Sequence, residues 1–301
     1  MSRSAAVAQA PHLPVTLMSS AAVLTRFPDV SLVRAGGQRW LRVSAAPSAI
    51  WKAVQAFFVT QGFTIKKPQP VAGMFETNWR PGLAQEQESH AKNGLDQVLS
   101  HRYAVGYQQR YRVRLERGRT DTTEVYLQSE AVREVVCGSS RKTQNAGRYW
   151  ELEPPEPAQD AAMLSRLAVY LGAHGRALAS MPAANTVSPG QDSSGRPMLR
   201  LTRTRHIWSR VGVALGQAGA VVLEADRKKD RYLVRFAPHS AIRSYGVQAL
   251  EAKRLKTARR YEVTVVAGVG NQGVTVTVAN VSGAAGRGAV ALRDALQQKL
   301  Q

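Results

Sequence analysis

The chain has 301 residues, enough for one large domain or two of ordinary size. Apolar residues make up 44% and charged residues 21%, a globular composition that excludes a disordered or fibrous chain. The net charge of +20 predicts an anionic partner or surface. The single cysteine, Cys137, excludes an internal disulfide framework and a cysteine-rich zinc site. No stretch approaches the roughly 18 apolar residues of a membrane-spanning helix, so we expect none.

Residues 1–36 are predicted to form an extended, mostly disordered arm. The segment is rich in alanine and serine, is interrupted by prolines and makes a poor signal peptide, with no cysteine to carry a lipid. Several hydrophobic residues in it lie outside any periodic element, and we expect them to bind a partner protein. These residues are Leu13, Val15, Leu17, Leu24 and Phe27. The alternative is a local flap that covers the first domain.

An internal repeat organises the rest of the chain. Residues 41–54 read LRVSAAPSAIWKAV and residues 199–211 read LRLTRTRHIWSRV, each an extended segment followed by an Ile-Trp pair. In both copies a glycine follows the tryptophan by eleven residues, and an aromatic residue follows that glycine by thirteen. These residues are Trp51, Gly62 and Phe75 in the first copy and Trp208, Gly219 and Tyr232 in the second. The spacing predicts two domains of one fold.

We place the first domain at residues 37–180 and the second at residues 198–301. Both lengths suit an independent domain. Residues 181–197 are rich in Pro, Gly, Ser and Asn and show no apolar periodicity, so they predict a linker.

In the first copy a strand at residues 40–43 precedes a helix that starts near Pro47 and ends at Gly62. Five apolar residues predict one buried face on this helix: Ile50, Trp51, Val54, Phe57 and Phe58. Residues 63–67 and 73–79 predict a strand pair. Apolar and charged residues then alternate along 110–116 and 123–129, which predicts an antiparallel sheet with one face in water. Residues 160–179 predict a closing helix.

The second copy repeats this order of elements. Its first helix carries Trp208, Val211 and Leu215, and its strands are predicted at residues 231–236, 260–266 and 273–281. Residues 291–300 predict the closing helix. Helices packed on one face of an antiparallel sheet make each copy an α+β domain.

We predict no catalytic, cofactor or metal site. GVGNQG at residues 268–273 has dinucleotide-loop spacing, but a strand follows it, so we expect a hairpin turn. The GxxG pattern within residues 283–288 predicts a loop before the last helix instead of a nucleic-acid clamp. No two of the six histidines are four apart, and we expect Glu86, Glu88 and His90 to form a solvated loop. Cys137 has no neighbouring base and is predicted to be structural.

The positive charge is concentrated in the second copy. Residues 196–301 hold 19 Lys and Arg against 6 Asp and Glu. Two clusters, 227–231 and 253–260, predict contact with an anionic surface such as phosphate or lipid headgroups, against the simpler reading of a solvated surface. Aromatic residues are not interleaved with them, which argues against nucleic acid.

Five segments in order resemble the BamC (NlpB) family of outer-membrane β-barrel assembly lipoproteins. They are FPDVSLVRAGGQRWLRV at 27–43, GMFETNW at 73–79, QRYRVRLERG at 109–118, TEVYLQSEAVREV at 123–135 and DAAMLSRLAVYLG at 160–172. The resemblance covers residues 27–172 by motif and the second copy by architecture. It implies two helix-grip domains and a non-catalytic binding role in the BAM complex, held through a BamD-type lipoprotein by the N-terminal segment.

The resemblance also implies an outer-membrane lipoprotein that faces the periplasm or the exterior. Family members begin with a lipidated cysteine that this sequence does not show, so we expect either a start site upstream of Met1 or an unanchored member. Two other functions stay open: a carrier of a small molecule or lipid in the helix-grip groove, and, below it, a nucleic-acid-binding protein that uses the basic second domain.

Overall fold

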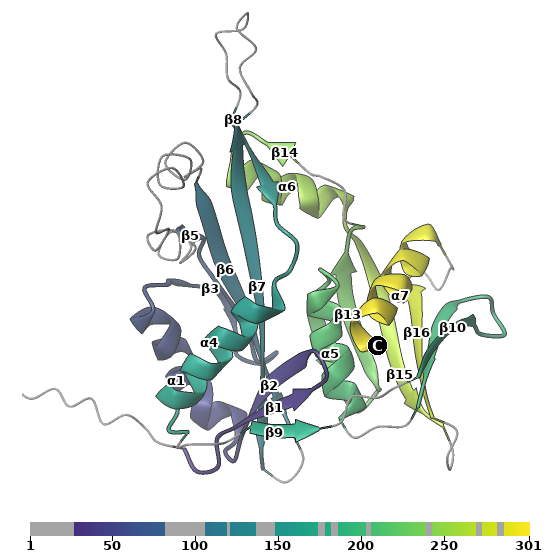
Figure 1. Cartoon of the computed structure of the whole chain (residues 1–301), viewed down its shortest axis with the longest axis horizontal. Helices are drawn as coiled ribbons and strands as arrows, with labels where there is room; N and C mark the ends of the chain where they lie inside the picture. The colour runs from purple at the N-terminus through teal and green to yellow at the C-terminus, as the bar shows by residue number, and fades with distance from the viewer. Residues whose placement is uncertain are drawn as a thin grey trace, which may run out of the picture.

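The computed structural model describes residues 27–81, 106–118, 121–136, 148–173, 178–181, 186–202, 206–238, 243–268, 273–281 and 286–301. Within these ranges the chain forms two sheets and five helices, which confirms the predicted α+β class (Figure 1). None of these helices is long and apolar enough to span a membrane.

The first sheet contains ten strands among the described residues. Its main path runs β3 (Ile65–Gln69), β4 (Met74–Thr77), β6 (Tyr107–Arg117), β7 (Thr123–Val136), β2 (Gln38–Val43), β1 (Ser31–Ala35) and β9 (Leu178–Met181). Off this path, β5 (Arg80–Pro81) pairs with β6, β8 (Arg148–Leu152) with β7, and β14 (Arg243–Ser244) with β8. The pairs are antiparallel except β1 with β9, which run parallel.

The second sheet has six strands in the described part of the chain. Its order is β10 (Val187–Gln191), β11 (Pro197–Leu201), β16 (Val274–Asn280), β15 (Arg259–Ala267), β13 (Arg231–Phe236) and β12 (Val221–Asp226). Read from β12, this order matches β3-β4-β6-β7-β2-β1 of the first sheet strand for strand. The repeated sequence pattern therefore corresponds to a repeated topology.

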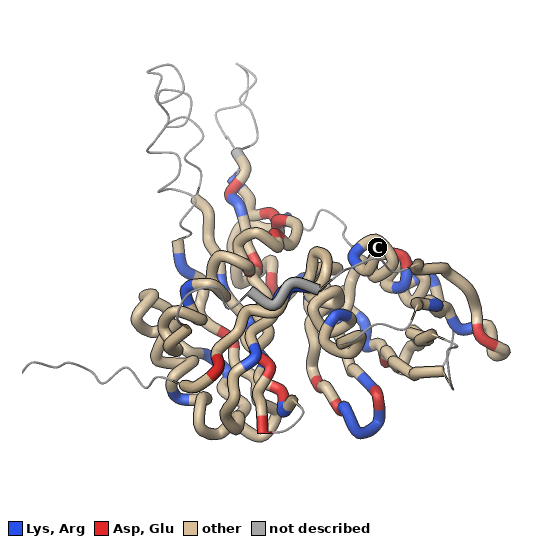
Figure 2. Tube along the Cα trace, turned by 60° about the horizontal axis from the view of Figure 1, so that its bottom comes forward, with Lys and Arg blue, Asp and Glu red and all other residues tan. Residues whose placement is uncertain are grey.

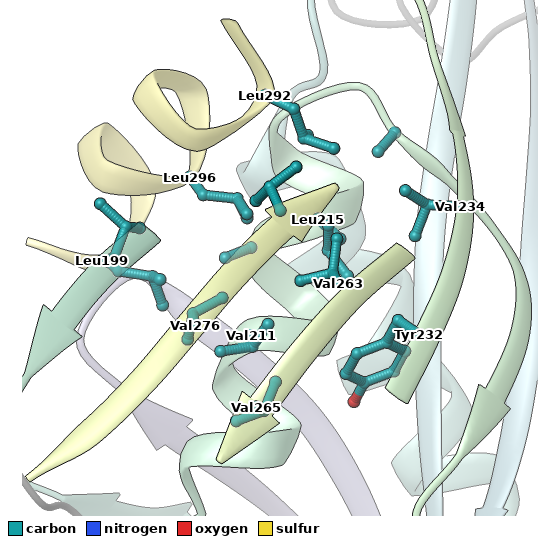
Figure 3. Close-up of a cluster of buried hydrophobic side chains, with 14 of the residues drawn as sticks. Leu199, Val211, Leu215, Tyr232, Val234, Val263, Val265, Val276, Leu292 and Leu296 are labelled. Carbon is teal, nitrogen blue, oxygen red and sulfur yellow. The ribbon is translucent and has the colours of Figure 1, made fainter. Parts of the chain in front are cut away.

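Each sheet packs two helices against one face, which we call its inner face. On the first sheet α1 (Pro47–Thr60) and α4 (Pro157–Tyr170) cover a core built around Phe57, Phe58 and Leu167. On the second sheet α5 (Ile207–Gln217) and α7 (Arg287–Leu300) do the same. Figure 3 shows Val211 and Leu215 of α5 and Leu292 and Leu296 of α7 meeting the valines of β13, β15 and β16. These cores follow from the 3.6-residue spacing in the helices and the two-residue spacing in the strands.

The spacing of the repeat has a direct structural meaning. Gly62 and Gly219 end the equivalent helices α1 and α5 with φ of 81° and 80°, a conformation that favours glycine. The tryptophan of each helix then contacts the aromatic residue 24 positions later. Trp51 meets Phe75 edge-on with ring centroids 5.5 Å apart, and Trp208 stacks on Tyr232 at 4.0 Å.

Four features of the structure differ from the prediction. Residues 31–35, assigned to the arm, form β1, and residues 187–191, assigned to the linker, form β10. The helix predicted over 160–179 ends at Tyr170, after which the chain turns and forms β9. An unpredicted helix, α6 (Val247–Thr257), covers part of the first sheet. The short strands contain Pro or lack apolar periodicity, and α6 buries only Leu250, so the sequence pattern was too weak to reveal them.

Candidate functional site

The outer face of the first sheet, opposite α1 and α4, is the surface on which the two repeats meet. We predicted that its alternating charged residues face water, and this prediction was wrong. Helix α5 lies between the two sheets and contacts β2 and β7, while α6 lies over β8 (Figure 1). Polar and charged side chains of β6 and β7 are therefore buried: Arg110, Arg114, Glu124 and Glu130. A two-residue alternation shows that one face is polar, but it does not distinguish water from a second polar surface.

Helix α5 has buried residues on more than one side because it packs against both sheets. Val211 and Leu215 enter the second core, whereas Val213 packs against Trp40 and Tyr126 on the first sheet. Gly212 makes the close approach possible. A Cβ added there would lie 2.7 Å from both the Arg114 Nη2 atom and the Tyr232 hydroxyl oxygen.

Two carboxylates of the first sheet bind the start of α5. The Trp208 indole nitrogen donates a 2.7 Å hydrogen bond to Glu116, which also pairs with Arg114 at 2.6 Å. Glu124 accepts hydrogen bonds from Ser209 at 3.0 Å and from Arg227 at 2.9 Å. Charge-assisted bonds of this kind are short and directional, so they define how the two sheets are oriented.

A second network lies under α6. Arg254 of α6 donates a 2.5 Å hydrogen bond to the buried Glu130, and Glu130 also pairs with Arg110 and Arg112 of β6. Arg110 in turn pairs with Glu251 of α6. This helix is thereby held by charges of both signs, in addition to the contact of Leu250 with Val132.

These ion pairs shift the pKa values of their carboxylates. Burial alone would raise the pKa of Glu76, but Arg112, Arg110 and Lys67 outweigh it and lower this pKa to about 2. Burial is likewise outweighed at Glu130, where Arg112, Arg254 and Arg110 hold the pKa well below its usual range. Both groups are therefore ionised at neutral pH.

A cleft of about 320 Å³ lies beside α5, between the outer face of the first sheet and the β12 end of the second. Apolar residues line part of it, among them Met74, Val213, Val222, Leu223 and Leu233. Its volume falls in the range of a small ligand or a few residues of a peptide.

Basic residues predominate over acidic ones in this cleft. Its charged lining residues are Lys67, Arg112, Arg114, Arg235, Arg260 and Glu76. Glu76 pairs with Arg112 and Lys67, and Arg114 pairs with Glu116. Arg235 and Arg260 are cross-strand partners on β13 and β15, and neither has an ion-pair partner among the described residues. Like charges placed directly opposite each other destabilise a sheet, so folding alone does not explain this pair.

The predicted partner-binding residues lie almost entirely outside the described part of the chain. This holds for Leu13, Val15, Leu17 and Leu24. Phe27 is described: it packs against the first core, and its amide donates a 2.9 Å hydrogen bond to the Leu171 carbonyl. The structure thus places Phe27 on the first sheet's helical layer.

The two basic clusters are partly consumed inside the molecule. Arg227 pairs with Glu124, and Arg231 pairs with Glu224 and Glu262. Arg254, whose side chain is only 14% exposed, pairs with Glu130. Figure 2 shows Lys and Arg spread over both halves of the molecule. Contact with an anionic surface stays a prediction for the remaining exposed residues of both clusters.

The sequence motifs that we set aside fall in turns and loops. Gly268 and Gly273, at the ends of GVGNQG, are joined by a 2.9 Å hydrogen bond between β15 and β16, which confirms the hairpin. Helix α7 starts at Arg287, within the last glycine-rich segment. Cys137 and the polar group Glu86, Glu88 and His90 lie outside the described residues. In the ranges that the structure covers, no three His, Cys, Asp or Glu side chains are grouped to hold a metal.

The sequence analysis missed the cleft. One signal was present: Gly212 and Gly216 are four residues apart on a predicted helix, which is typical of a close approach by another surface. Arg235 and Arg260 could not be paired in advance, because their register depends on how β13 and β15 align.

Comparison with known proteins identifies relatives of the whole arrangement. The chain is 33% identical over 223 residues to the outer membrane protein assembly factor BamC of Accumulibacter regalis, which covers 71% of this chain and 57% of the relative. It is 31% identical over 208 residues to the BamC of Thiobacillus denitrificans, or 67% of this chain and 55% of that protein. An uncharacterized protein of Neisseria meningitidis serogroup B is 28% identical over 298 residues, 94% of this chain and 74% of the relative.

No protein-family model matches the chain. The chain spans a little more than half the length of the two BamC relatives. The similarity nevertheless agrees with the motifs at residues 27–172, which recur in order along β1 to α4. By this similarity, the chain belongs to the BamC family of outer membrane protein assembly factors.

Proposed function

We propose that the protein is a non-catalytic accessory subunit of the outer-membrane β-barrel assembly (BAM) complex and acts as a protein-binding module at the outer membrane. The observation that carries this proposal is the similarity to two proteins named as outer membrane protein assembly factors, at 33% and 31% identity. The two sheets, oriented by buried ion pairs, offer a large preformed surface on which partners can bind without reorganising the chain.

The proposed partner is a BamD-type lipoprotein, bound by the segment that precedes the first sheet. This segment supplies the hydrophobic residues Leu13, Val15, Leu17 and Leu24. Phe27 packs on the first core and marks the place where the segment leaves the folded part. An apolar segment next to a rigid body can bind a groove on another protein, at the cost of its own ordering.

The test uses the full chain, tagged in the bacterium that encodes it, with membranes extracted in mild detergent. We expect assembly subunits to co-purify and to be identified by mass spectrometry. A variant lacking residues 1–26 should lose the BamD-type subunit while its Tm stays unchanged, because β1 begins only at Ser31.

A matched pair of variants separates the hydrophobic side chains from the length of the segment. In the first, Leu13, Val15, Leu17 and Leu24 are replaced by serine; in the second, Ala5, Ala6, Ala8 and Ala10 are. Only the first should lose the partner. Full co-purification by both variants would overturn the proposed binding segment, and the absence of every assembly subunit from the full chain would overturn the function.

A further inference from the structure

The cleft beside α5 contains the free edge of a sheet. Strand β12 is the last strand of the second sheet and pairs only with β13 within the described residues. Its residues Val221, Val222 and Leu223 line the cleft. A free edge presents unpaired backbone N–H and C=O groups, which can bind another extended chain.

Two other strands end the sheets, and both carry residues that discourage pairing. Strand β3 reads IKKPQ, with two lysines and a proline, and its register shifts between Lys66 and Gln69. Strand β10 contains Pro189 and Gly190. Strand β12 reads VVLEAD and has neither Lys nor Pro, although its register also shifts near Val222. Of these edges, β12 is the one best suited to accept another strand.

The charges around this edge select the occupant. Arg235 of β13 and Arg260 of β15 lie opposite each other and line the same cleft, with no described carboxylate paired to either. The nearest acidic lining residue, Glu76, is already held by Arg112 and Lys67. An incoming carboxylate would relieve the repulsion between the two arginines, whereas an incoming cation would increase it.

The apolar residues of the cleft add a second requirement. Met74 lies on the first sheet, Val213 on α5 and Leu223 on β12, so an occupant meets apolar groups from three elements. A strand that alternates acidic and apolar residues presents carboxylates on one side and apolar side chains on the other. A lipid headgroup would satisfy the arginines but not the free backbone groups of β12.

We propose that the cleft binds an extended acidic segment of a partner protein, which adds as a strand to the free edge of β12 while its carboxylates pair with Arg235 and Arg260. This inference rests on the proposed function, since it names the chemistry of one protein ligand for the binding module.

The probe is an end-blocked synthetic peptide of eight residues that alternates Glu and Val and carries a fluorophore, with a Gln/Val peptide as its neutral control. Binding to the full chain is measured by fluorescence anisotropy. We expect saturable binding of the acidic peptide. The double variant R235Q/R260Q should bind it about tenfold more weakly, because two cations are lost. The matched control is R200Q, which removes one exposed arginine from β11 of the same sheet, outside the cleft lining.

Hydrogen exchange distinguishes strand addition from simple charge attraction. At saturating peptide, amides in residues 221–226 should exchange more slowly, whereas those of β10 at residues 187–191 should be unchanged. Equal binding by the neutral and acidic peptides, or by R200Q and R235Q/R260Q, would overturn the proposal. Binding without slower exchange at residues 221–226 would also overturn it.

Two further outcomes separate this inference from other readings. Vesicles of phosphatidylglycerol that bind through Arg235 and Arg260, with no binding of peptide, would assign the cleft to an anionic lipid and overturn the inference. If R235Q/R260Q still co-purifies assembly subunits while no peptide binds the wild type, the inference fails and the proposed function stands. If no subunit co-purifies with the wild type, the proposed function fails independently of the peptide result.

Discussion

Trp208, on the first helix of the second repeat, donates its indole N–H to Glu116, on a strand of the first repeat, at 2.7 Å. The same ring stacks on Tyr232 of its own sheet, with ring centroids 4.0 Å apart. One residue therefore serves the core of one repeat and the junction with the other. The equivalent Trp51 is half-buried and meets Phe75 edge-on.

We predict that Trp208→Phe destabilises the protein more than Trp51→Phe. The first change keeps an aromatic ring on Tyr232 but removes the donor to Glu116, which should lower the free energy of unfolding by about 1–3 kcal/mol. The second should cost below about 1 kcal/mol, because an edge-on aromatic contact remains possible. Urea denaturation followed by circular dichroism measures both. Equal losses would show that the hydrogen bond to Glu116 contributes nothing.

A second prediction concerns the two glycines of α5. Gly212→Ala places a methyl group 2.7 Å from Arg114 and Tyr232, and should destabilise the protein by about 1–3 kcal/mol through overpacking. At Gly216 the nearest atom would be 3.4 Å away, on the Gln128 side chain. Gly216→Ala should be neutral or stabilising by up to about 1 kcal/mol, because alanine favours the helix. Thermal melting of both variants checks the contrast, and a neutral Gly212→Ala would contradict the close approach of α5.

A third prediction concerns Glu130. Replacing it by alanine leaves Arg110, Arg112 and Arg254 without their shared carboxylate, and should cost about 3–5 kcal/mol. The control is Glu153→Ala, which breaks a pair with the 57% exposed side chain of Arg133 and should cost about 0–1 kcal/mol. Chemical denaturation of both variants makes the comparison. Similar small losses would mean that α6 does not depend on this network.

A fourth prediction concerns acid. The pKa of Glu76 is lowered to about 2 in the folded protein from a usual value of 4.5, so the folded state binds fewer protons than the unfolded state between these values. Its contribution to stability is complete above pH 4.5 and is lost as the pH falls toward 2. Glu130 is shifted in the same direction. The free energy of unfolding, measured at pH 6, 4 and 3, should fall with pH, and less steeply in Glu76→Gln.

The sequence predicted the repeated elements well and the contacts between repeats poorly. Helices with apolar residues at 3.6-residue spacing, such as the one carrying Ile50 and Phe57, have one pattern that matches one structure. Gly62 and Gly219 lie where predicted because a helix end with positive φ favours glycine. Such features depend on residues close together in the chain.

The junction depends on residues far apart, and for that reason it was not predicted. Glu130 and Arg254 are 124 residues apart, and Glu116 and Trp208 are 92 apart. A charged residue on a strand has the same pattern whether its partner is water or a distant arginine. The cleft was missed for the same reason, since its walls come from both sheets and from α5.

The position of β14 and α6 has a consequence for how the chain unfolds. This segment lies between β13 and β15 of the second sheet in sequence, yet β14 pairs with β8 and α6 packs on the first sheet. One repeat therefore carries a piece of the other's surface. Two domains joined only by a linker can melt separately, but here the loss of either sheet removes contacts from the other. Calorimetry of the intact chain should accordingly show one cooperative transition.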